Sequence, residues 1–346
     1  MMEPARTERP WRPLAVVAGV LVVYALGSKI PLPGLDVERL AAMPMQGAMS
    51  RLSVMALGLM PFLSVLIFFE IAKLAIPPFA QWQARSPAMA YRLLLIFVVV
   101  LATMQAYGVV SALAGAGLLQ ADDNTTMLAV IAALVGGTLL LAWLADRIAL
   151  PGIGNGFWLV WIAPFLGGFA ALAATVITAM QVGALGLGGV LIGLAYILLA
   201  SAAVVLANRV IARGDYGVAP IAIQALIWPP LLANVVAGYI AAFFYLVFSL
   251  SPRALAIIQL ILLVPLIALF VYAYMRQSMR AEAAPGYAVR AAPWVLLCLL
   301  ELVVCVGGEL LSEFLVLPWR FSGALLIITV TVMMSLLRLL PFKASA

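Results

Sequence analysis

Residues 91–113 of the chain read YRLLLIFVVVLATMQAYGVVSAL, an apolar run in which Arg92 is the only charged residue. An α-helix needs about 20 mostly apolar residues to cross the hydrocarbon core of a membrane, so this run is long enough to span one. Nine other stretches have a similar length and polarity. The sequence therefore predicts ten membrane spans, at about residues 13–31, 54–76, 91–113, 126–146, 156–180, 186–208, 223–248, 253–275, 293–315 and 319–340.

The composition of the 346 residues agrees with this interpretation. Hydrophobic residues make up 66% of the chain and charged residues 9%, whereas soluble domains have about 45–50% and about 25%. Lipid offers no water to backbone polar groups, so the runs are expected to be helices. They lack the alternation of polar and apolar residues that is typical of membrane β-barrels. The predicted fold class is an all-α integral membrane protein.

Several classes of functional site are excluded by residue usage. The chain has no histidine, which rules out His-ligated metal sites, Ser-His-Asp triads and histidine pH switches. Its two cysteines, Cys298 and Cys305, lie seven positions apart in one apolar run, where packing is the simplest role. The phosphate-loop pattern G-x-x-x-x-G-K-[ST] is absent from the sequence. No cofactor is expected, and any transport would draw its energy from a gradient or a partner.

The distribution of basic residues predicts the orientation in the membrane. The net charge is +6, with 19 Lys and Arg residues in all. Ten spans place both termini on the same side. If that side is the cytoplasm, 14 basic residues are cytoplasmic and five are external, which matches the excess of Lys and Arg in cytoplasmic loops. The five external residues would be Lys29, Arg39, Arg51, Arg253 and Arg320.

The segment after the first span departs from a plain helix bundle. Pro31 and Pro33 end the first span. The following residues, 37–50, are too few and too mixed in polarity to cross the membrane. They form either a surface loop or a re-entrant segment, which lipid allows only where protein or a water-filled cavity surrounds it. Composition leaves both alternatives open.

Two further motifs lie at span ends. Gly152-Ile-Gly-Asn-Gly156 follows Trp143-Leu-Ala-Asp-Arg147 and predicts a tight cytoplasmic turn; its spacing does not fit a nucleotide-binding glycine motif. Leu317-Pro-Trp-Arg-Phe-Ser-Gly323 opens the last span with the aromatic and basic residues that are common at membrane interfaces.

Taken in order, these motifs resemble the SecY protein-translocation channel family. The resemblance covers nearly the whole chain and is densest in residues 1–160. The matching elements are Leu26-Gly-Ser-Lys-Ile-Pro-Leu-Pro-Gly-Leu-Asp36, Ser50-Arg51, Ala56-Leu-Gly-Leu-Met-Pro-Phe62, Gln105, the Trp143-Leu-Ala-Asp146 and Gly152–Gly156 motifs, Pro229-Pro-Leu-Leu-Ala233, and Leu317–Gly323.

The resemblance implies a fold and an activity. The family has two five-helix halves related as an inverted repeat around a central pore, a common plan for membrane conduits. Here the halves would be residues 1–180 and 181–346. The implied function is that of a SecY-like preprotein translocase subunit, which moves unfolded polypeptides across the membrane or sideways into it. Such a subunit is not an enzyme, because any ATP hydrolysis belongs to a partner motor.

The resemblance also implies a ring of apolar side chains that seals the pore. An apolar constriction can block ions by excluding water. The family usually has branched aliphatic residues at the ring, so Phe157 and Trp161 are departures. Judged from the residues alone, core or lipid-facing roles are the preferred interpretation of all six positions. The matching residues are Leu59, Leu63, Phe157, Trp161, Leu231 and Ile328.

A plug and a lateral gate are implied as well. The plug would be residues 37–50, shorter than usual in the family, with Arg51 directly after it. The gate would run between the second and third spans on one side and the seventh and eighth on the other. Its polar candidates are Gln105, Asn234 and Glu70, because polar groups within spans are often functional.

Two acidic residues within spans have simpler alternatives. Glu70 lies three positions before Lys73, a spacing that also allows a local ion pair on the helix surface. Glu301 lies deep in the ninth span without an obvious partner and receives no role.

The cytoplasmic loops are shorter than those with which the family docks a ribosome or the SecA motor. Their basic residues either meet an acidic partner or only set the orientation. The docking candidates are Arg209, Arg213, Arg276, Arg280 and Arg290. The implied partners are SecE-like and SecG-like subunits, the translocating polypeptide, and a SecA-like motor or ribosome. The implied location is a bacterial inner membrane.

Three functions stay open. The first is a diverged SecY-type channel with a narrower substrate range or a different motor. The second is a ten-span secondary transporter, although the sequence has no polar constellation for a small solute. The third is a non-conducting paralog that acts as an insertase or assembly factor. The intact apolar ring favours the channel.

Overall fold

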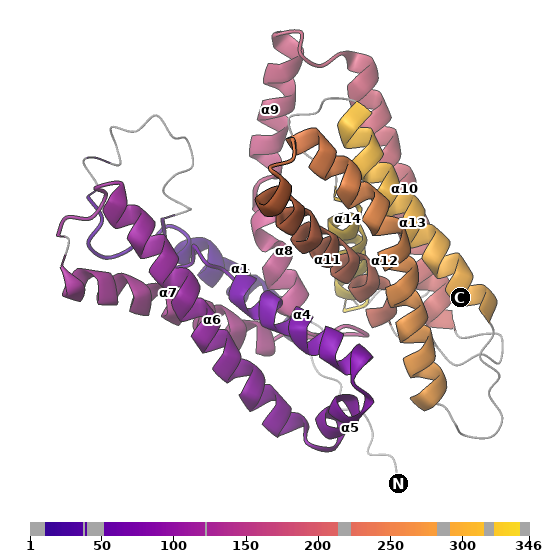
Figure 1. The fold of residues 1–346 in the computed structure, drawn as a ribbon, viewed down its shortest axis with the longest axis horizontal. Helices are drawn as coiled ribbons and strands as arrows, with labels where there is room; N and C mark the ends of the chain where they lie inside the picture. Colours follow the sequence, from indigo (N-terminus) through magenta and orange to yellow (C-terminus); the bar gives the residue numbers. More distant parts are fainter. Residues whose placement is uncertain are drawn as a thin grey trace. The chain divides into compact units, whose positions relative to one another are not determined.

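The structure is a computed structural model in which residues 11–36, 39, 52–121, 123–213, 223–281, 291–314 and 322–339 are described. Helices form nearly all of this part of the chain, as the sequence predicts, and one short strand pair is present (Figure 1). The chain divides into two compact units. Unit 1 comprises residues 1–150, 154–164 and 339–346, and unit 2 comprises residues 151–153 and 165–338.

Unit 1 is built from a few long helices joined by structured loops. The helix α4 packs against α6, and α6 packs against α7 (Figure 1). The short helix α5 is bent by 114° from α4. The elements of unit 1 are α1 (Trp11–Gly27), α4 (Met60–Ala75), α5 (Pro77–Arg85), α6 (Pro87–Gly115), α7 (Asn124–Asp146), β1 (Ala149–Leu150), β2 (Gly154–Asn155) and the first part of α8 (Phe157–Gly167).

Unit 2 is a helical bundle in which α14 contacts three other helices: α10, α11 and α13. The helix α14 approaches α13 closely at its start, because a Cβ atom on Gly323 would lie 2.4 Å from the carbonyl oxygen of Val304. The complete helices of unit 2 are α9 (Phe169–Gln181), α10 (Leu187–Arg213), α11 (Gln224–Phe248), α12 (Pro252–Ala281), α13 (Ala291–Phe314) and α14 (Gly323–Leu337).

Each of the ten predicted spans contains helix, but the helices differ in length. Seven segments of the described chain are long and apolar enough to cross a membrane: α6, α7, α8 with α9, α10, α11, α12 and α13. The bent pair α4 and α5 would make an eighth. The apolar helices α1 and α14 are shorter. The predicted second span, 54–76, becomes helical only at Met60, because residues 52–58 form turns, with Gly58 at a φ of 55°, and Pro61 lies in the first helical turn.

The helix α6 shows why these sequences form membrane helices. Its buried residues recur every three or four positions, so they form one stripe along the helix: Ala90, Leu94, Val98, Ala102, Ala106, Val110 and Leu113. The other faces are also apolar, and large side chains such as Ile96 and Met104 are exposed. A helix that is apolar all round has faces suited to both protein and lipid.

Candidate functional site

The loop that follows α1 is fixed within unit 1 on two sides. The amide of Leu32 donates to Leu52 O at 3.0 Å, and the amide of Val54 donates to Ile30 O at 3.0 Å. Farther along, the amide of Asp36 donates to Leu118 O at 2.9 Å. Residues 30–36 therefore lie between the segment that precedes α4 and the turn that joins α6 to α7.

An apolar cluster lies beneath this loop. Leu32 and Leu35 of the loop, Leu118 and Leu119 of the α6–α7 turn, and the adjoining ends of α6 and α7 are buried together. Burial of apolar surface contributes roughly 25 cal/mol per Å². The loop is thus part of the core of unit 1, although it contains two prolines and a glycine.

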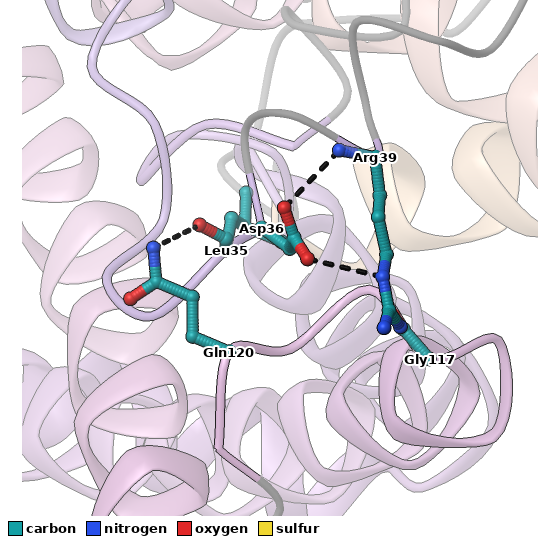
Figure 2. A network of polar contacts seen from close by, with 5 residues as sticks. All are labelled: Leu35, Asp36, Arg39, Gly117 and Gln120. Atoms are coloured by element: carbon teal, nitrogen blue, oxygen red, sulfur yellow. Dashed lines mark hydrogen bonds and ion pairs between the residues drawn. The ribbon is translucent and has the colours of Figure 1, made fainter.

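Polar side chains complete the attachment of the loop to the turn (Figure 2). The guanidinium of Arg39 donates from Nη1 to Gly117 O at 2.7 Å, and its Nε lies 3.1 Å from Asp36 Oδ2. The side chain of Gln120 donates to Leu35 O at 3.0 Å. Of the predicted plug, residues 37–50, Arg39 is the one described residue; Arg51, also predicted to matter here, lies outside the described residues.

Four of the six ring candidates belong to unit 1. Leu59 precedes the first residue of α4, and Leu63 lies in its first turns; both are buried. Phe157 starts α8 and is also buried, with its ring 5.3 Å from that of Phe62. Trp161, one turn after Phe157, is half-buried. Aromatic rings at this separation stabilise the contact beyond their area alone, so α4 and α8 are joined by an aromatic pair at the ring candidates.

The other two ring candidates belong to unit 2. Leu231 of α11 and Ile328 of α14 are buried, and their helices pack against each other. Leu231 follows Pro229 and Pro230, which lie inside α11 and are buried as well. All six candidates are apolar, and five are buried. Their joint role as one ring stays a prediction.

The gate candidates lie on three helices. Gln105 of α6 is half-buried beside Ala106 of the apolar cluster. Asn234 of α11 donates from its side chain to Pro230 O at 2.8 Å. Glu70 of α4 forms an ion pair with Lys73, which confirms the local pairing that the spacing allowed. A role of these residues in a gate stays a prediction.

The glycine-rich motif forms the predicted turn. In unit 1, β1 and β2 pair antiparallel, and Asn155 donates from Nδ2 to Asp146 Oδ1 at 2.9 Å. The hydroxyl of Tyr91 also donates to the Asp146 carboxylate. A carboxylate at the centre of this network argues against an anion-binding site. In unit 2, Ser335 donates to Pro151 O at 2.8 Å.

The docking candidates are only partly described. Arg209 of α10 and Arg276 of α12 are exposed. Arg213 and Arg280 lie at the ends of these helices, where the backbone alone is described, and Arg290 lies outside the described residues. Within the described part of the chain, no group of three or more Asp, Glu or Cys residues is placed to hold a metal ion.

Among the polar contacts that sequence reasoning missed, two join distant parts of the same unit. One is the contact of Arg39 with Gly117, because the chain separation of 78 residues hides it. The other joins α10 to α14 in unit 2, where buried Asn208 donates to Thr331 Oγ1 at 3.2 Å. An asparagine within an apolar run was the available signal for the second contact, since polar groups in membrane helices seek partners.

The sequence matches known proteins. A sequence model of the SecY family matches residues 53–284. The protein translocase subunit SecY of Buchnera aphidicola subsp. Acyrthosiphon kondoi is 31% identical over 192 residues, which cover 49% of this chain and 54% of the relative. The subunit of the same name from Escherichia coli K12 is 30% identical over 192 residues, covering 49% and 43%. The chain thus spans about half the length of these relatives.

The fold also matches solved structures. A structure described as that of a protein conducting channel aligns with a TM-score of 0.57 at 15% identity, covering 100% of this chain and 97% of the other. Sec61 in the canine ribosome-channel complex aligns with a TM-score of 0.58 at 14% identity, with the same coverage. The fold is therefore that of the SecY and Sec61 channels, and the chain is a multi-pass membrane protein.

Proposed function

The chain belongs to the SecY family, and from this membership we propose that it is the channel subunit of a protein translocase. It moves unfolded polypeptides across a bacterial inner membrane or laterally into it. The observation that carries the proposal is the family match over residues 53–284. That range includes five of the six ring candidates and all three gate candidates. The family is one of channel subunits rather than enzymes, so the work of translocation falls to a partner.

The apolar ring supplies the seal in this proposal. Leu59, Leu63, Phe157 and Trp161 contribute from unit 1, and Leu231 and Ile328 contribute from unit 2. An apolar constriction excludes water and therefore blocks ions. A polypeptide in transit can still push the apolar side chains apart and pass between them. Because Phe157 and Trp161 are aromatic rather than branched aliphatic, they either narrow the opening or shift the position of the seal. Residues 37–50, followed by Arg51, act as the plug.

The lateral gate lies between α4 and α6 on one side and α11 and α12 on the other. Gln105 and Asn234 are polar groups on these helices, and such groups are costly in lipid but useful along a path that alternates between lipid and water. Glu70 belongs to the same set, with its charge balanced by Lys73. The halves that part at the gate are residues 1–180 and 181–346, related as an inverted repeat.

The proposed partners follow from the family. Small membrane subunits like SecE and SecG brace the two halves, and both termini of the chain face the cytoplasm. The solved Sec61 structure comes from a ribosome-channel complex, which supports a ribosome as the cytosolic partner here; a SecA-like motor is the alternative that the family implies. The docking set is Arg209, Arg213, Arg276, Arg280 and Arg290.

Site-specific photocrosslinking to a stalled secretory chain in native membranes tests the function. A photoreactive residue replaces Leu63 in the ring, and a second variant carries it at Asn234 in the gate. A threaded polypeptide is expected to crosslink to both positions. The matched control on α4 is Phe68, whose side chain is 60% exposed and faces away from the packed side of the helix.

The outcomes separate the alternative functions. Crosslinks at Leu63 but not at Phe68 support a conducting channel. Crosslinks at Asn234 alone indicate an insertase that receives helices sideways. The absence of crosslinks at both sites, in folded and abundant protein, contradicts the channel and leaves an assembly factor or a secondary transporter.

A further inference from the structure

The helix α6 ends in a glycine motif that leaves one carbonyl turned outward. The amide of Leu118 donates to Leu113 O at 3.0 Å, and the amide of Gly117 donates to Ala114 O at 2.9 Å. Gly117 has a φ of 65°, the left-handed conformation that such a helix end requires and glycine adopts at least cost. This arrangement satisfies the carbonyls of Leu113 and Ala114, while that of Gly117 remains available for a partner from outside the helix.

Arg39 supplies that partner. Its Nη1 donates to Gly117 O at 2.7 Å across 78 positions of sequence. Asp36 orients the guanidinium, because Asp36 Oδ2 lies 3.1 Å from Arg39 Nε and Asp36 Oδ1 accepts from the Arg39 amide at 3.1 Å. A cation at the carboxyl end of a helix is also favoured by the helix dipole. We call the contact among Asp36, Arg39 and Gly117 the clasp (Figure 2).

The clasp acts together with backbone hydrogen bonds. The amide of Gln120 donates to Gly34 O at 2.8 Å, and the amide of Asp36 donates to Leu118 O at 2.9 Å. Leu35 and Leu119 face each other as an isolated antiparallel bridge. This end of α6 is thus held to the loop after α1 by its backbone, by the apolar cluster and by the clasp, of which only the clasp depends on a charged side chain.

We propose that Arg39 is a positioning residue for the lateral gate. By holding the Gly117 end of α6 against the rest of unit 1, the clasp keeps the helix that carries Gln105 in its closed position. The inference rests on the proposed function, because α6 is a gate helix only if the chain is a SecY-type channel. Without the clasp, the end of α6 separates more often from the loop and the gate opens more often at rest.

Amide hydrogen exchange of the full chain in lipid vesicles tests the clasp itself. The Arg39→Gln variant is expected to exchange about five-fold faster at the amides of Asp36 and Gln120, the factor that matches loss of one exposed charge-assisted contact. Lys29→Gln is the matched control, since Lys29 is an exposed basic residue on the same loop. Unchanged exchange in Arg39→Gln would overturn the proposal.

Potassium efflux from vesicles that hold the same proteins tests the link to the gate, because the gate helices α4 and α11 carry Leu63 and Leu231 of the proposed ion seal. Arg39→Gln is expected to raise resting efflux about five-fold, because loss of the same exposed contact shifts the opening equilibrium by that factor. Lys29→Gln is expected to leave the efflux unchanged. Faster exchange with unchanged efflux would overturn the proposal, because the clasp would then stabilise the loop without affecting the gate.

A disulfide between the loop after α1 and the end of α6 should reverse the effect of Arg39→Gln. Paired residues in an antiparallel bridge have Cα atoms about 4.5–5.5 Å apart, within the range of a disulfide. The substitutions Leu35→Cys and Leu119→Cys are made in a Cys298→Ser/Cys305→Ser background together with Arg39→Gln. Oxidation is expected to return efflux to the background level and reduction to raise it again. High efflux with the disulfide formed would contradict a positioning role.

A ring variant distinguishes failure of the clasp from failure of the channel. Leu63→Ser places a hydroxyl in the proposed seal and is measured in the same vesicles. If it conducts while Arg39→Gln does not, only the clasp proposal fails. If neither conducts, the channel proposal fails, and the clasp proposal fails with it.

Discussion

The two units hold their helices together by different means. In unit 1, loops contribute: residues 30–36 are hydrogen bonded to the segment before α4 and to the turn after α6. In unit 2, contacts between helices are prominent, as in the close approach of Gly323 to Val304 and the hydrogen bond from Asn208 to Thr331, and a turn contributes the bond from Ser335 to Pro151. The comparison indicates that unit 1 is sensitive to changes in its loops and unit 2 to changes in its helix faces.

Two glutamates make the difference sharper. Glu70 of unit 1 is 8% exposed and forms an ion pair with Lys73. Glu301 of unit 2 is 0% exposed, and neither of its carboxyl oxygens has a hydrogen-bond partner among the described residues. Removing the partner of a buried charge lowers the stability of the fold. Burying a polar group that has no hydrogen-bond partner lowers it as well. Removal of the cation beside Glu70 should therefore destabilise unit 1, whereas removal of the Glu301 carboxyl should stabilise unit 2.

The largest expected effect concerns Gly137 of α7 in unit 1. A Cβ atom there would lie 2.0 Å from Val54 O, a backbone atom that cannot move without disturbing the loop before α4. Gly137→Ala is expected to lower the free energy of unfolding by about 3 kcal/mol, measured by SDS titration in detergent micelles. The neighbouring Gly136 has nothing within 4 Å, so Gly136→Ala is the control. Equal stability of the two variants would contradict the close approach of α7 to this loop.

Removal of Lys73 should have the next largest effect. Lys73→Met leaves the Glu70 carboxylate buried without its cation, and both side chains are at least four-fifths buried. The expected loss of stability is about 2–3 kcal/mol in the same titration. Lys73→Arg preserves the charge and should cost much less. A loss of similar size in both variants would indicate that packing of the lysine stem, and not the ion pair, matters.

Replacement of Glu301 should have the opposite sign. Glu301→Leu removes two buried oxygens without hydrogen-bond partners and keeps a similar volume, so stability is expected to rise by about 1–2 kcal/mol. The Glu301→Gln variant keeps a polar side chain at the same position, so its stability should rise less. Loss of stability in Glu301→Leu would show that the carboxyl has a favourable contact in the folded protein and would remove the contrast with Glu70.

The smallest effect concerns Asp123, which caps α7. Its side chain accepts hydrogen bonds from the Thr125 hydroxyl and the Thr126 amide, which lower its pKa to about 2. A carboxyl with a lowered pKa stabilises the fold above its usual pKa of about 4, and this contribution is lost as the pH falls through about 2. Amide exchange of Thr126, corrected for its intrinsic rate, should therefore increase on acidification.

The control for Asp123 is the uncharged cap. Asp123→Asn still accepts the Thr126 hydrogen bond and should respond less to pH over this range. Asp123→Ala should exchange quickly at every pH. An Asp123→Asn variant with the same pH response as the natural protein would assign the effect to another group.

Local patterns in the sequence predicted the helices well. Each of the ten apolar runs contains helix in the part of the chain that the structure describes, because lipid allows few other structures for them; the short helix α5 lies outside the runs. The Glu70–Lys73 ion pair was foreseeable from its spacing of three residues. The start of α4 at Met60 was not, because residues 52–58 are apolar but are held in turns against the loop after α1.

Contacts between distant residues could not be predicted from the sequence. Arg39 counted only as one external charge, since nothing local indicates that the carbonyl of Gly117 is its acceptor. Ring candidates such as Phe157 were located through the family resemblance, and their apolar character alone fits many positions. Which distant residues meet depends on how the helices pack. No single local pattern in the sequence specifies that packing.

The exposure of the clasp has a consequence for how the protein responds to salt. The Arg39 side chain is 65% exposed and that of Asp36 is 24% exposed, so dissolved ions reach their charges. Salt shortens the range of such an interaction, with a Debye length of about 8 Å at 0.15 M and about 3 Å at 1 M. The buried Glu70–Lys73 pair is screened far less. A higher salt concentration would therefore weaken the hold of the clasp on the end of α6 and have a smaller effect on α4.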